Sequence, residues 1–393
     1  MSYADILLQE NESLHPSDLF QQQEEEPNIS TSSTRIPYPT ALSPSAAAEF
    51  KACPQSYLFQ YLYGIRQPTN LALAKGRICH GALEHLFDLE PSQRTLEQLQ
   101  NLFRLIWSKE RLKEEYIHLF DVPDTSSSSS DQVQRDIEAE RKWGLESLRL
   151  LENYYHLEDP RLIPRQNPLE REIWVQAKLT LDPSKGVTGT SRSGAHVSSA
   201  VEESIHTDET FLVRGIVDRL DYVAVPSSPQ DTFLKTTEET MDACVRIVDY
   251  KTGKAPEFKY SPSMNEQIAN QNMWQLKIYA LLLKEMIAGN NNTNSKGGNL
   301  KYILPHQLRL LRLMYLTSED GTARYLDMDL GETEEEQNRV LQEVHNDLSE
   351  IWMGIRELVQ TQDPKAFRHC QRKFCVCHTL RPKFVRGSLY HDQ

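Results

Sequence analysis

The sequence predicts an α/β protein in which a helical subdomain precedes a mixed β-sheet flanked by helices. Three observations lead to this fold class. Apolar residues recur at helical spacing up to about residue 160, alternating strands rich in Val and Ile begin at Leu169, and a long helical pattern separates the third strand from the fourth. This order of elements is typical of a sheet covered by helices.

The N-terminal third of the chain is predicted to hold a polar lead and a helical subdomain. Residues 1–38 are acidic and rich in Gln, so we expect them to be disordered. Residues 39–165 are expected to be helical. The first helix lies in "LSPSAAAEFKACPQSYLFQYLYG", where Pro44 takes the first helical position and Gly64 follows the last.

Three further helices are expected in this subdomain. The segment "AKGRICHGALEHLFDLE" starts near Ala74 and places its apolar residues on one face. Two more amphipathic segments cover residues 95–119 and 131–157, and a Ser-rich stretch separates them.

Residues 166–362 are predicted to form the sheet. Its strands are expected in "LEREIWVQAKLTL", "FLVRGIVDRLDYV", "ACVRIVDYKTG" and "LRLLRLMYL". Polar insertions at 183–209 and 226–241 separate the first three strands. The helix "NEQIANQNMWQLKIYALLLKEMIAG" precedes the fourth strand, and a final helix opens with a capping box made by Thr333 and Glu336.

The C-terminal segment, residues 363–393, combines cysteines with basic residues. The formal charge of −13 argues against a nucleic-acid partner for the chain as a whole, because affinity for phosphate comes largely from Lys and Arg. This segment nevertheless holds seven basic residues and no acid over one stretch: Lys365, Arg368, Arg372, Lys373, Arg381, Lys383 and Arg386. The stretch predicts a local contact for nucleic acid, and a solvated basic tail would explain it equally well.

Absent patterns narrow the class of protein. The chain has no membrane-spanning apolar run and no signal-peptide or transit-peptide pattern, so we expect a soluble intracellular protein without membrane contact. It has no G-x-x-x-x-G-K-S/T phosphate-binding loop. It is therefore not itself a P-loop helicase, and any unwinding would come from a separate helicase or repair complex.

Two acids and a lysine are the strongest candidates for chemistry. Asp218 and Asp249 come near the ends of successive strands, and neighbouring strands are roughly 5 Å apart, so both carboxylates can hold one hard divalent cation. Lys251 follows Asp249 by two residues, which puts both side chains on one face of the strand. A metal ion beside an ammonium group suits phosphodiester hydrolysis. The alternative is a cross-strand salt bridge of Lys251.

Five segments in order resemble the motifs of RecB-like exonucleases in the PD-(D/E)XK nuclease superfamily. These segments are "LSPSAAAEFKACPQSYLFQYLYGI", "KGRICHGALEHLF", "GIVDRLDY", "IVDYKTG" and "QLKIYALLL", within residues 42–382. The resemblance implies a restriction-endonuclease-like core and a metal-dependent DNA nuclease that uses Mg²⁺ or Mn²⁺. It also implies an exonuclease that acts on single-stranded ends in DNA repair, recombination or replication.

The resemblance assigns roles to individual residues. It makes His80 a metal ligand, Asp218 and Asp249 the carboxylate ligands, and Lys251 the catalytic lysine. It places Gln275 and Tyr279 near the substrate phosphate, and their spacing of four residues puts them on one helix face. Glu84, one helical turn after His80, could hydrogen-bond its imidazole or form a plain helix pair. Glu170 and Glu172 begin the first strand and could join the site, although their spacing does not require it.

Four of the six cysteines resemble the ligands of the family's iron–sulfur variant. In that variant one Cys near the first helix, matching Cys53, joins three C-terminal ones around a [4Fe–4S] cluster. The family's C-terminal spacing is C-x2-C-x5-C, whereas Cys370, Cys375 and Cys377 give C-x4-C-x-C. A zinc site that includes these residues or His378, and a set without metal, remain alternatives. The other two cysteines, Cys79 and Cys244, are expected to be buried apolar residues.

A second hypothesis is a non-catalytic nucleic-acid-binding or scaffold subunit of a repair complex that keeps the nuclease fold. The joint presence of His80, Asp218, Asp249 and Lys251 favours the enzyme.

Overall fold

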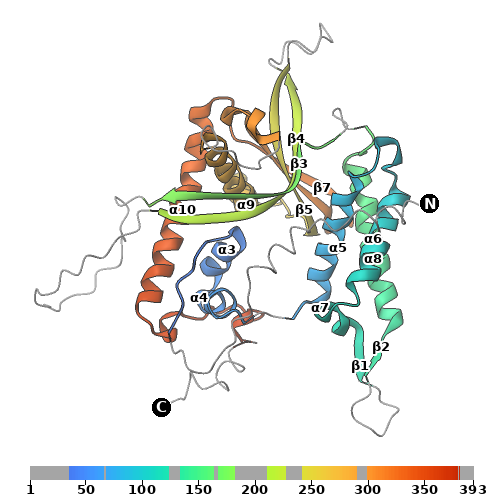
Figure 1. The fold of residues 1–393 in the computed structure, drawn as a ribbon, viewed down its shortest axis with the longest axis horizontal. Helices are drawn as coiled ribbons and strands as arrows, with labels where there is room; N and C mark the ends of the chain where they lie inside the picture. Colours follow the sequence, from blue (N-terminus) through green and yellow to red (C-terminus); the bar gives the residue numbers. More distant parts are fainter. Residues whose placement is uncertain are drawn as a thin grey trace, which may run out of the picture. The chain divides into compact units, whose positions relative to one another are not determined.

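The computed structural model describes residues 35–65, 68–123, 133–162, 167–181, 210–226, 241–289, 299–378 and 380 (Figure 1). Several predicted features lie outside these residues: the lead up to residue 34, positions 183–209 and 227–240 of the two polar insertions, and the basic residues Arg381, Lys383 and Arg386.

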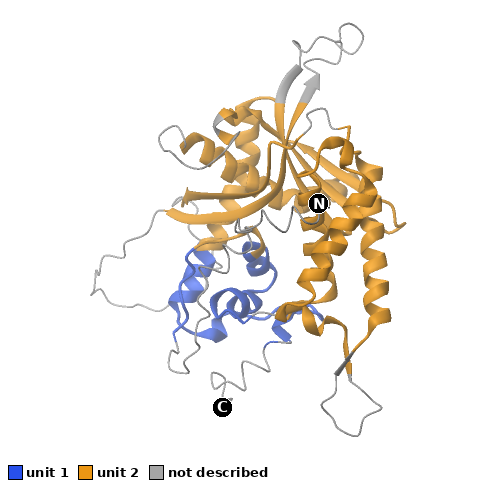
Figure 2. Ribbon diagram, turned by 45° about the vertical axis from the view of Figure 1, so that its right-hand side comes forward, with its two compact units in different colours: residues 1–40, 46–67, 353–393 blue, residues 41–45, 68–352 orange. Residues whose placement is uncertain are grey.

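The chain divides into two compact units (Figure 2). The first comprises residues 1–40, 46–67 and 353–393, and the second comprises residues 41–45 and 68–352. The boundary expected near residue 166 falls inside the second unit. The reason is that apolar side chains of the helices after residue 68 share one core with strands of the sheet.

The second unit contains a mixed sheet of five strands in the order β3-β4-β5-β6-β7. The strands are β3 (Glu170–Thr180), β4 (Thr210–Pro226), β5 (Met241–Lys254), β6 (Leu308–Thr317) and β7 (Arg324–Asp329). Only β5 and β6 are parallel; the other neighbours are antiparallel. Four strands were predicted, and β7 was not, because its short sequence "RYLDMD" holds only two alternating apolar residues, Leu326 and Met328, among three charged ones.

Strand β4 changes its neighbour near its middle. It pairs with β3 from Thr210 onward, but with β5 only from Arg219 to its end. On the other side of this point the segment at Leu42 bridges Val213 in parallel, with backbone hydrogen bonds of 2.9 and 3.0 Å on either side. Figure 1 shows the β3–β4 pair bending sharply as it leaves the rest of the sheet.

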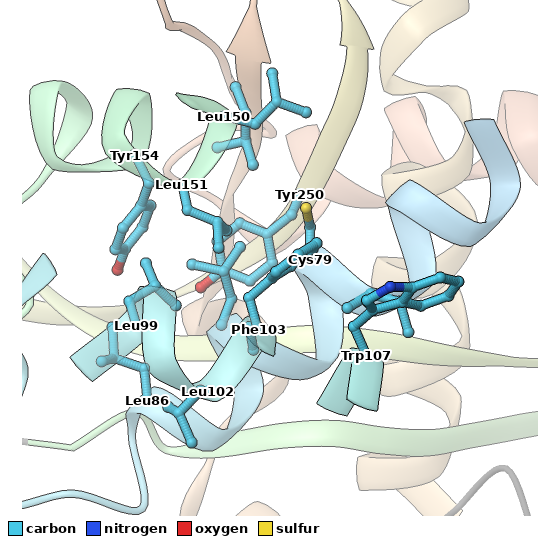
Figure 3. Close-up of a cluster of buried hydrophobic side chains, with 14 of the residues drawn as sticks. Cys79, Leu86, Leu99, Leu102, Phe103, Trp107, Leu150, Leu151, Tyr154 and Tyr250 are labelled. Atoms are coloured by element: carbon cyan, nitrogen blue, oxygen red, sulfur yellow. The ribbon is translucent and has the colours of Figure 1, made fainter. Parts of the chain in front are cut away.

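Three helices share a core with the sheet: α5 (Leu71–Leu86), α6 (Leu96–Glu110) and α8 (Ile137–Leu157). Their buried side chains meet Val248 and Tyr250 of β5 and Met314 and Leu316 of β6. Figure 3 shows part of this cluster, including Cys79. Cys79 and Cys244 are both buried, as predicted.

The helical segment after α5 is more broken than predicted. The helix expected over 95–119 ends at Glu110 and is followed by the short α7 (Glu114–Ile117). The helix expected from residue 131 starts at Ile137, because β1 (Asp121–Pro123) and β2 (Val133–Arg135) form a small hairpin before it. Asp136 caps α8 by accepting a hydrogen bond of 2.9 Å from Ala139 N–H.

Two long helices follow β5 and β7 in the chain. Helix α9 (Pro262–Gly289) contacts β3, β4, β5 and β6 through its buried second half. Helix α10 (Glu334–Gln360) has the predicted capping box: Glu336 N–H donates to Thr333 Oγ1, and Thr333 N–H donates to Glu336 Oε2, both at 3.2 Å.

In the first unit, the predicted helix from Pro44 to Tyr63 is interrupted. It consists of α3 (Pro44–Ala52), α4 (Pro54–Tyr57) and a π-helical turn, η1 (Leu58–Leu62). Cys53 between them is extended, with φ −163°, and its Sγ accepts a hydrogen bond from Ser56 N–H at 3.4 Å. The interruption follows from Pro54, which cannot donate to the preceding turn and disfavours a helical residue before it.

The remaining elements are short 3₁₀ turns: η2 (Pro91–Gln93), η3 (His118–Phe120), η8 (Asn299–Tyr302), η9 (Pro305–Gln307) and η10 (Pro364–Ala366). Within the described ranges, none of the helices combines the length and apolar composition that a membrane crossing requires.

Candidate active site

The site forms where β4 bends. The register pairs Arg171 with Arg219 and Ile173 with Val217, so Glu172 and Asp218 stand between these pairs. Glu172 has φ +44°, in the left-handed region that a non-glycine residue rarely adopts. Such a conformation costs about 1–3 kcal/mol and is found most often at functional sites. Asp218 itself lies inside the long strand β4 and not near a strand end, where it was predicted.

Three side chains from three elements converge at this bend. His80 of α5, Glu172 of β3 and Asp218 of β4 each offer a ligand atom, and these atoms all lie within 4.8 Å of one another. His80 Nδ1 is 3.3 Å from Asp218 Oδ2, which also accepts a hydrogen bond of 2.8 Å from Tyr250 N–H. Carboxylate oxygens suit Mg²⁺ and Mn²⁺, whereas an imidazole nitrogen is a ligand of transition-metal ions, so the mixed set fits Mn²⁺ better than Mg²⁺.

The electrostatics of the bend favour a cation. Burial, together with the charges of Asp218, Glu84 and Asp249, raises the pKa of Glu172 to about 9. Burial and, less strongly, the charge of Asp249 raise the pKa of Asp218 to about 6, although His80 and Tyr250 N–H oppose the shift. A divalent cation would stabilise the ionised form of both carboxyls, so the residues present fit a metal ion.

Asp249 and Lys251 of β5 form an ion pair beside these three side chains. Lys251 Nζ lies 2.6 Å from Asp249 Oδ2, and this buried oxygen accepts no hydrogen bond of good geometry. Asp249 is 4% exposed, whereas Lys251 is 30% exposed and accessible to a substrate. Asp249 acts on Glu172 and Asp218 through its charge but does not join them within ligand distance. Its assignment as a metal ligand stays a prediction.

Helix α9 holds the lysine from the other side. Gln275 Oε1 accepts a hydrogen bond of 3.0 Å from Lys251 Nζ, and Gln275 Nε2 donates to Tyr279 Oη at 2.8 Å. The predicted face shared by Gln275 and Tyr279 thus points at Lys251. Tyr279 is 6% exposed, and burial followed by the charge of Asp249 raises its pKa, so its hydroxyl stays protonated.

Gly215 makes room for this arrangement. A Cβ at Gly215 of β4 would stand 2.6 Å from Cε1 of Tyr279. This distance is far below van der Waals contact, so the ring can pack against β4 only where the strand lacks a side chain.

A network of buried charged side chains lies next to the residues of the site. The Arg219 guanidinium is 1% exposed and donates to both oxygens of Glu158, at 2.5 and 3.0 Å, and to Asp221 Oδ2 at 2.8 Å. It also donates to Tyr250 Oη at 2.7 Å, and the Tyr250 ring meets His80 edge-on with centroids 5.9 Å apart. The network fixes the residues that follow Asp218 and Asp249 in the chain.

The first unit contains a separate cysteine centre. The Sγ atoms of Cys53, Cys370, Cys375 and Cys377 all lie within 4.8 Å of one another, although Cys53 is over 300 residues away in sequence. None of the described cysteines forms a disulfide. Four thiols at this spacing have the donor set of a structural metal site.

Arg372 lies against this cysteine centre. Its Nε donates to Cys370 Sγ and its Nη2 to Cys375 Sγ, each at 3.5 Å. Hydrogen bonding from Arg372 is the largest of the effects that lower the pKa of the Cys370 thiol to about 6. A thiol with such a pKa is ready to bind metal near neutral pH.

Every predicted site residue lies among the described ones. His80, Asp218, Asp249, Lys251, Gln275 and Tyr279 meet around the bend, and the four cysteines meet in the other unit. Glu172 was named only as a candidate, yet it lies within ligand distance of His80 and Asp218. Its place at the start of a predicted strand made it a candidate, but only the register of β3 against β4 puts it opposite Asp218.

Comparison with known protein families identifies the superfamily of the chain. The model of the PD-(D/E)XK nuclease superfamily matches residues 41–379, a span that includes the bend, helix α9 and all four residues of the cysteine centre. A search of curated proteins found no match.

Proposed function

Because the chain belongs to the PD-(D/E)XK nuclease superfamily, we propose that it is a metal-dependent nuclease that hydrolyses phosphodiester bonds in DNA, as an exonuclease on single-stranded ends. The observation that carries the proposal is the meeting of His80, Glu172 and Asp218 directly beside the Asp249–Lys251 pair. The RecB-like motifs support the exonuclease assignment and a role in DNA repair, recombination or replication.

The carboxylates and the histidine would hold the metal ion. His80, Glu172 and Asp218 would supply ligand atoms, and Asp249, whose charge acts on both carboxyls, would join them as the fourth ligand that the resemblance implies. When bound, Mg²⁺ or Mn²⁺ would polarise the scissile phosphate and lower the pKa of a coordinated water.

Lys251 would act on the same phosphate as a positioned cation. Asp249 and Gln275 hold its ammonium group from two sides, so the charge is in place before substrate arrives. A preorganised cation of this kind stabilises the charge that develops on the phosphoryl oxygens or orients the attacking water. Tyr279 fixes Gln275, so we propose that these two residues position Lys251 rather than react.

We propose that the cysteine centre binds a metal cofactor that staples the two ends of the first unit. The resemblance favours [4Fe–4S], and zinc is the alternative. Analysis of iron, sulfide and zinc in protein purified without oxygen distinguishes the two metals. Absorbance at about 400 nm, which arises from iron–sulfur charge transfer, would indicate the cluster.

The test of the nuclease proposal is product analysis on end-labelled single-stranded and double-stranded DNA with Mg²⁺, Mn²⁺ or EDTA. We expect EDTA-sensitive release of short products from single-stranded ends. Asp218→Ala and Lys251→Ala should each lower the rate by about 10²-fold or more while leaving the chain folded. Binding without cleavage under every metal condition would instead indicate the scaffold function.

A further inference from the structure

A loop with two exposed aromatic rings follows the catalytic strand. Residues 255–261 connect β5 to α9, and in this loop Phe258 is 45% and Tyr260 55% exposed. Met264, in the first turn of α9, is 46% exposed. Large apolar side chains of this size are usually buried, so three of them within seven residues indicate a contact surface.

The loop is held in one conformation by a single side chain. Asn265 Oδ1 accepts a hydrogen bond of 3.2 Å from Tyr260 N–H, and its Nδ2 donates to the carbonyls of Phe258 and Tyr260 at 3.3 and 3.0 Å. These bonds satisfy the backbone on both sides of the rings. The rings are therefore presented to solvent by a braced loop.

A single stripe on α9 joins this loop to the active site. Positions 264, 268, 271 and 275 follow at spacings of three and four residues and so share one helix face. The helix is not buried before Met273, and Gln271 is exposed. At 1.5 Å per residue, the helix carries the stripe about 15 Å from Gln275 to Asn265. That is roughly the length of four stacked nucleotides.

We propose that Phe258 and Tyr260 form a stacking platform for the bases of an unpaired DNA strand whose phosphate lies at Lys251. This inference rests on the proposed nuclease function and adds the residues that would select single strands. Bases of an unpaired strand expose their faces, whereas those of a duplex are stacked on one another. The two rings lie on one loop, and one face of α9 joins this loop to the catalytic lysine. They would therefore bind an unpaired strand in preference to a duplex.

The charges of the loop do not by themselves attract nucleic acid. Lys259 pairs with Glu257 within the loop itself, so its ammonium group is partly neutralised. Lys254 is exposed at the end of β5 and lies between Lys251 and Phe258 in the chain, so it can contribute a contact to a phosphate. Stacking on the two rings is therefore the main interaction that this loop offers. An unpaired nucleic-acid strand is the occupant that fits both the rings and the nearby active site.

The experiment measures DNA binding by fluorescence anisotropy with the full chain in EDTA, where no cleavage occurs. The probes are a labelled single-stranded oligonucleotide, the same strand with abasic positions in place of its bases, and the duplex. The variants are Phe258→Ala/Tyr260→Ala and the ring-preserving Phe258→Tyr/Tyr260→Phe. Tyr325→Ala, which removes a 52% exposed ring from β7, is the matched control.

We expect the double alanine variant to bind the base-bearing single strand at least about fivefold more weakly per ring lost, because each stacked base contributes measurably. Its affinity for the abasic strand should be unchanged, and the ring-preserving variant and Tyr325→Ala should behave like the wild type. Equal weakening for both strands, or no weakening at all, overturns the proposal. The latter would assign the rings to another partner, such as a protein. Binding is measured without turnover, so this test does not depend on cleavage. If the chain cleaves no DNA, the nuclease function is refuted, but the effect of the two rings on DNA binding can still be measured.

Discussion

Gly215 of β4 and Tyr279 of α9 pack so closely that a methyl group on the glycine would stand 2.6 Å from the tyrosine ring. Gly215→Ala should therefore push the ring away and break the chain of hydrogen bonds from Tyr279 through Gln275 to Lys251. We expect about a tenfold or greater loss of cleavage rate with a loss of about 1–3 kcal/mol in the free energy of unfolding. Cleavage assays and denaturant unfolding measure the two effects.

Gly144→Ala is the control for this substitution. Gly144 lies inside α8, and a Cβ there meets nothing within 4 Å. It should stabilise the chain by up to about 1 kcal/mol and leave cleavage unchanged. Full activity in Gly215→Ala would show that the position of Tyr279 does not matter for Lys251.

Glu172 is expected to contribute to metal affinity more than to folding. Glu172→Gln removes a carboxylate from the group with His80 and Asp218, so half-maximal cleavage should need on the order of tenfold or more Mn²⁺ or Mg²⁺. Glu170→Gln, two residues earlier on β3, should leave the metal dependence unchanged. Identical metal titrations for wild type and Glu172→Gln would remove Glu172 from the site.

The ion pair between Glu158 and Arg219 should make stability depend on acid. Burial alone would raise the pKa of Glu158, but the Arg219 guanidinium outweighs burial and holds this pKa below its ordinary value of 4.5. The pair therefore stabilises the fold above about pH 4.5, and this contribution is lost as the pH falls through the lowered pKa.

Glu158→Gln leaves Arg219 with a weaker partner in a buried position and should cost about 3 kcal/mol at neutral pH. The difference between wild type and variant should shrink in acid, as measured by urea unfolding at pH 7 and pH 3. Asp159→Asn, which breaks a more exposed pair with Arg161, should cost less than about 1 kcal/mol. A difference that does not change with pH would contradict the linkage.

Loss of one thiol should empty the cysteine centre. Cys375→Ser should lower bound metal per chain and reduce the melting temperature, because a structural metal binds the folded state and not the unfolded one. Cys244→Ala, at a buried cysteine outside the centre, should keep the metal content of the wild type. Equal metal content in both variants, measured by inductively coupled plasma mass spectrometry, would show that the four thiols do not bind metal.

The sequence predicted those parts of the molecule that depend on local patterns. The alternation in β4 and β5 places Asp218 and the Asp249–Lys251 pair on strands, and helical spacing brings Gln275 and Tyr279 to one face. These relations need only the period of a strand or a helix.

The remaining features depend on contacts that no local pattern encodes. Glu172 enters the site because β3 adopts a left-handed residue opposite Asp218, and nothing in "LEREIW" specifies that conformation. The cysteine centre closes through the fold of the first unit, despite spacing that departs from the expected motif. The pairing of Leu42 with Val213 joins segments 171 residues apart.

Strand β4 pairs with β3 from Thr210 to Leu220, and it also pairs with Leu42 before Asp218 and with β5 after it, so backbone hydrogen bonds hold the strand on both sides of this carboxylate. A one-residue slip in any of these ladders would turn Asp218 to the opposite face of the sheet. The connections from β3 to β4 and from β4 to β5 start well away from that point, at Thr180 and Pro226. Insertions or deletions in these two connections would therefore not displace the reacting groups. Both connections can vary in length and sequence over evolutionary time.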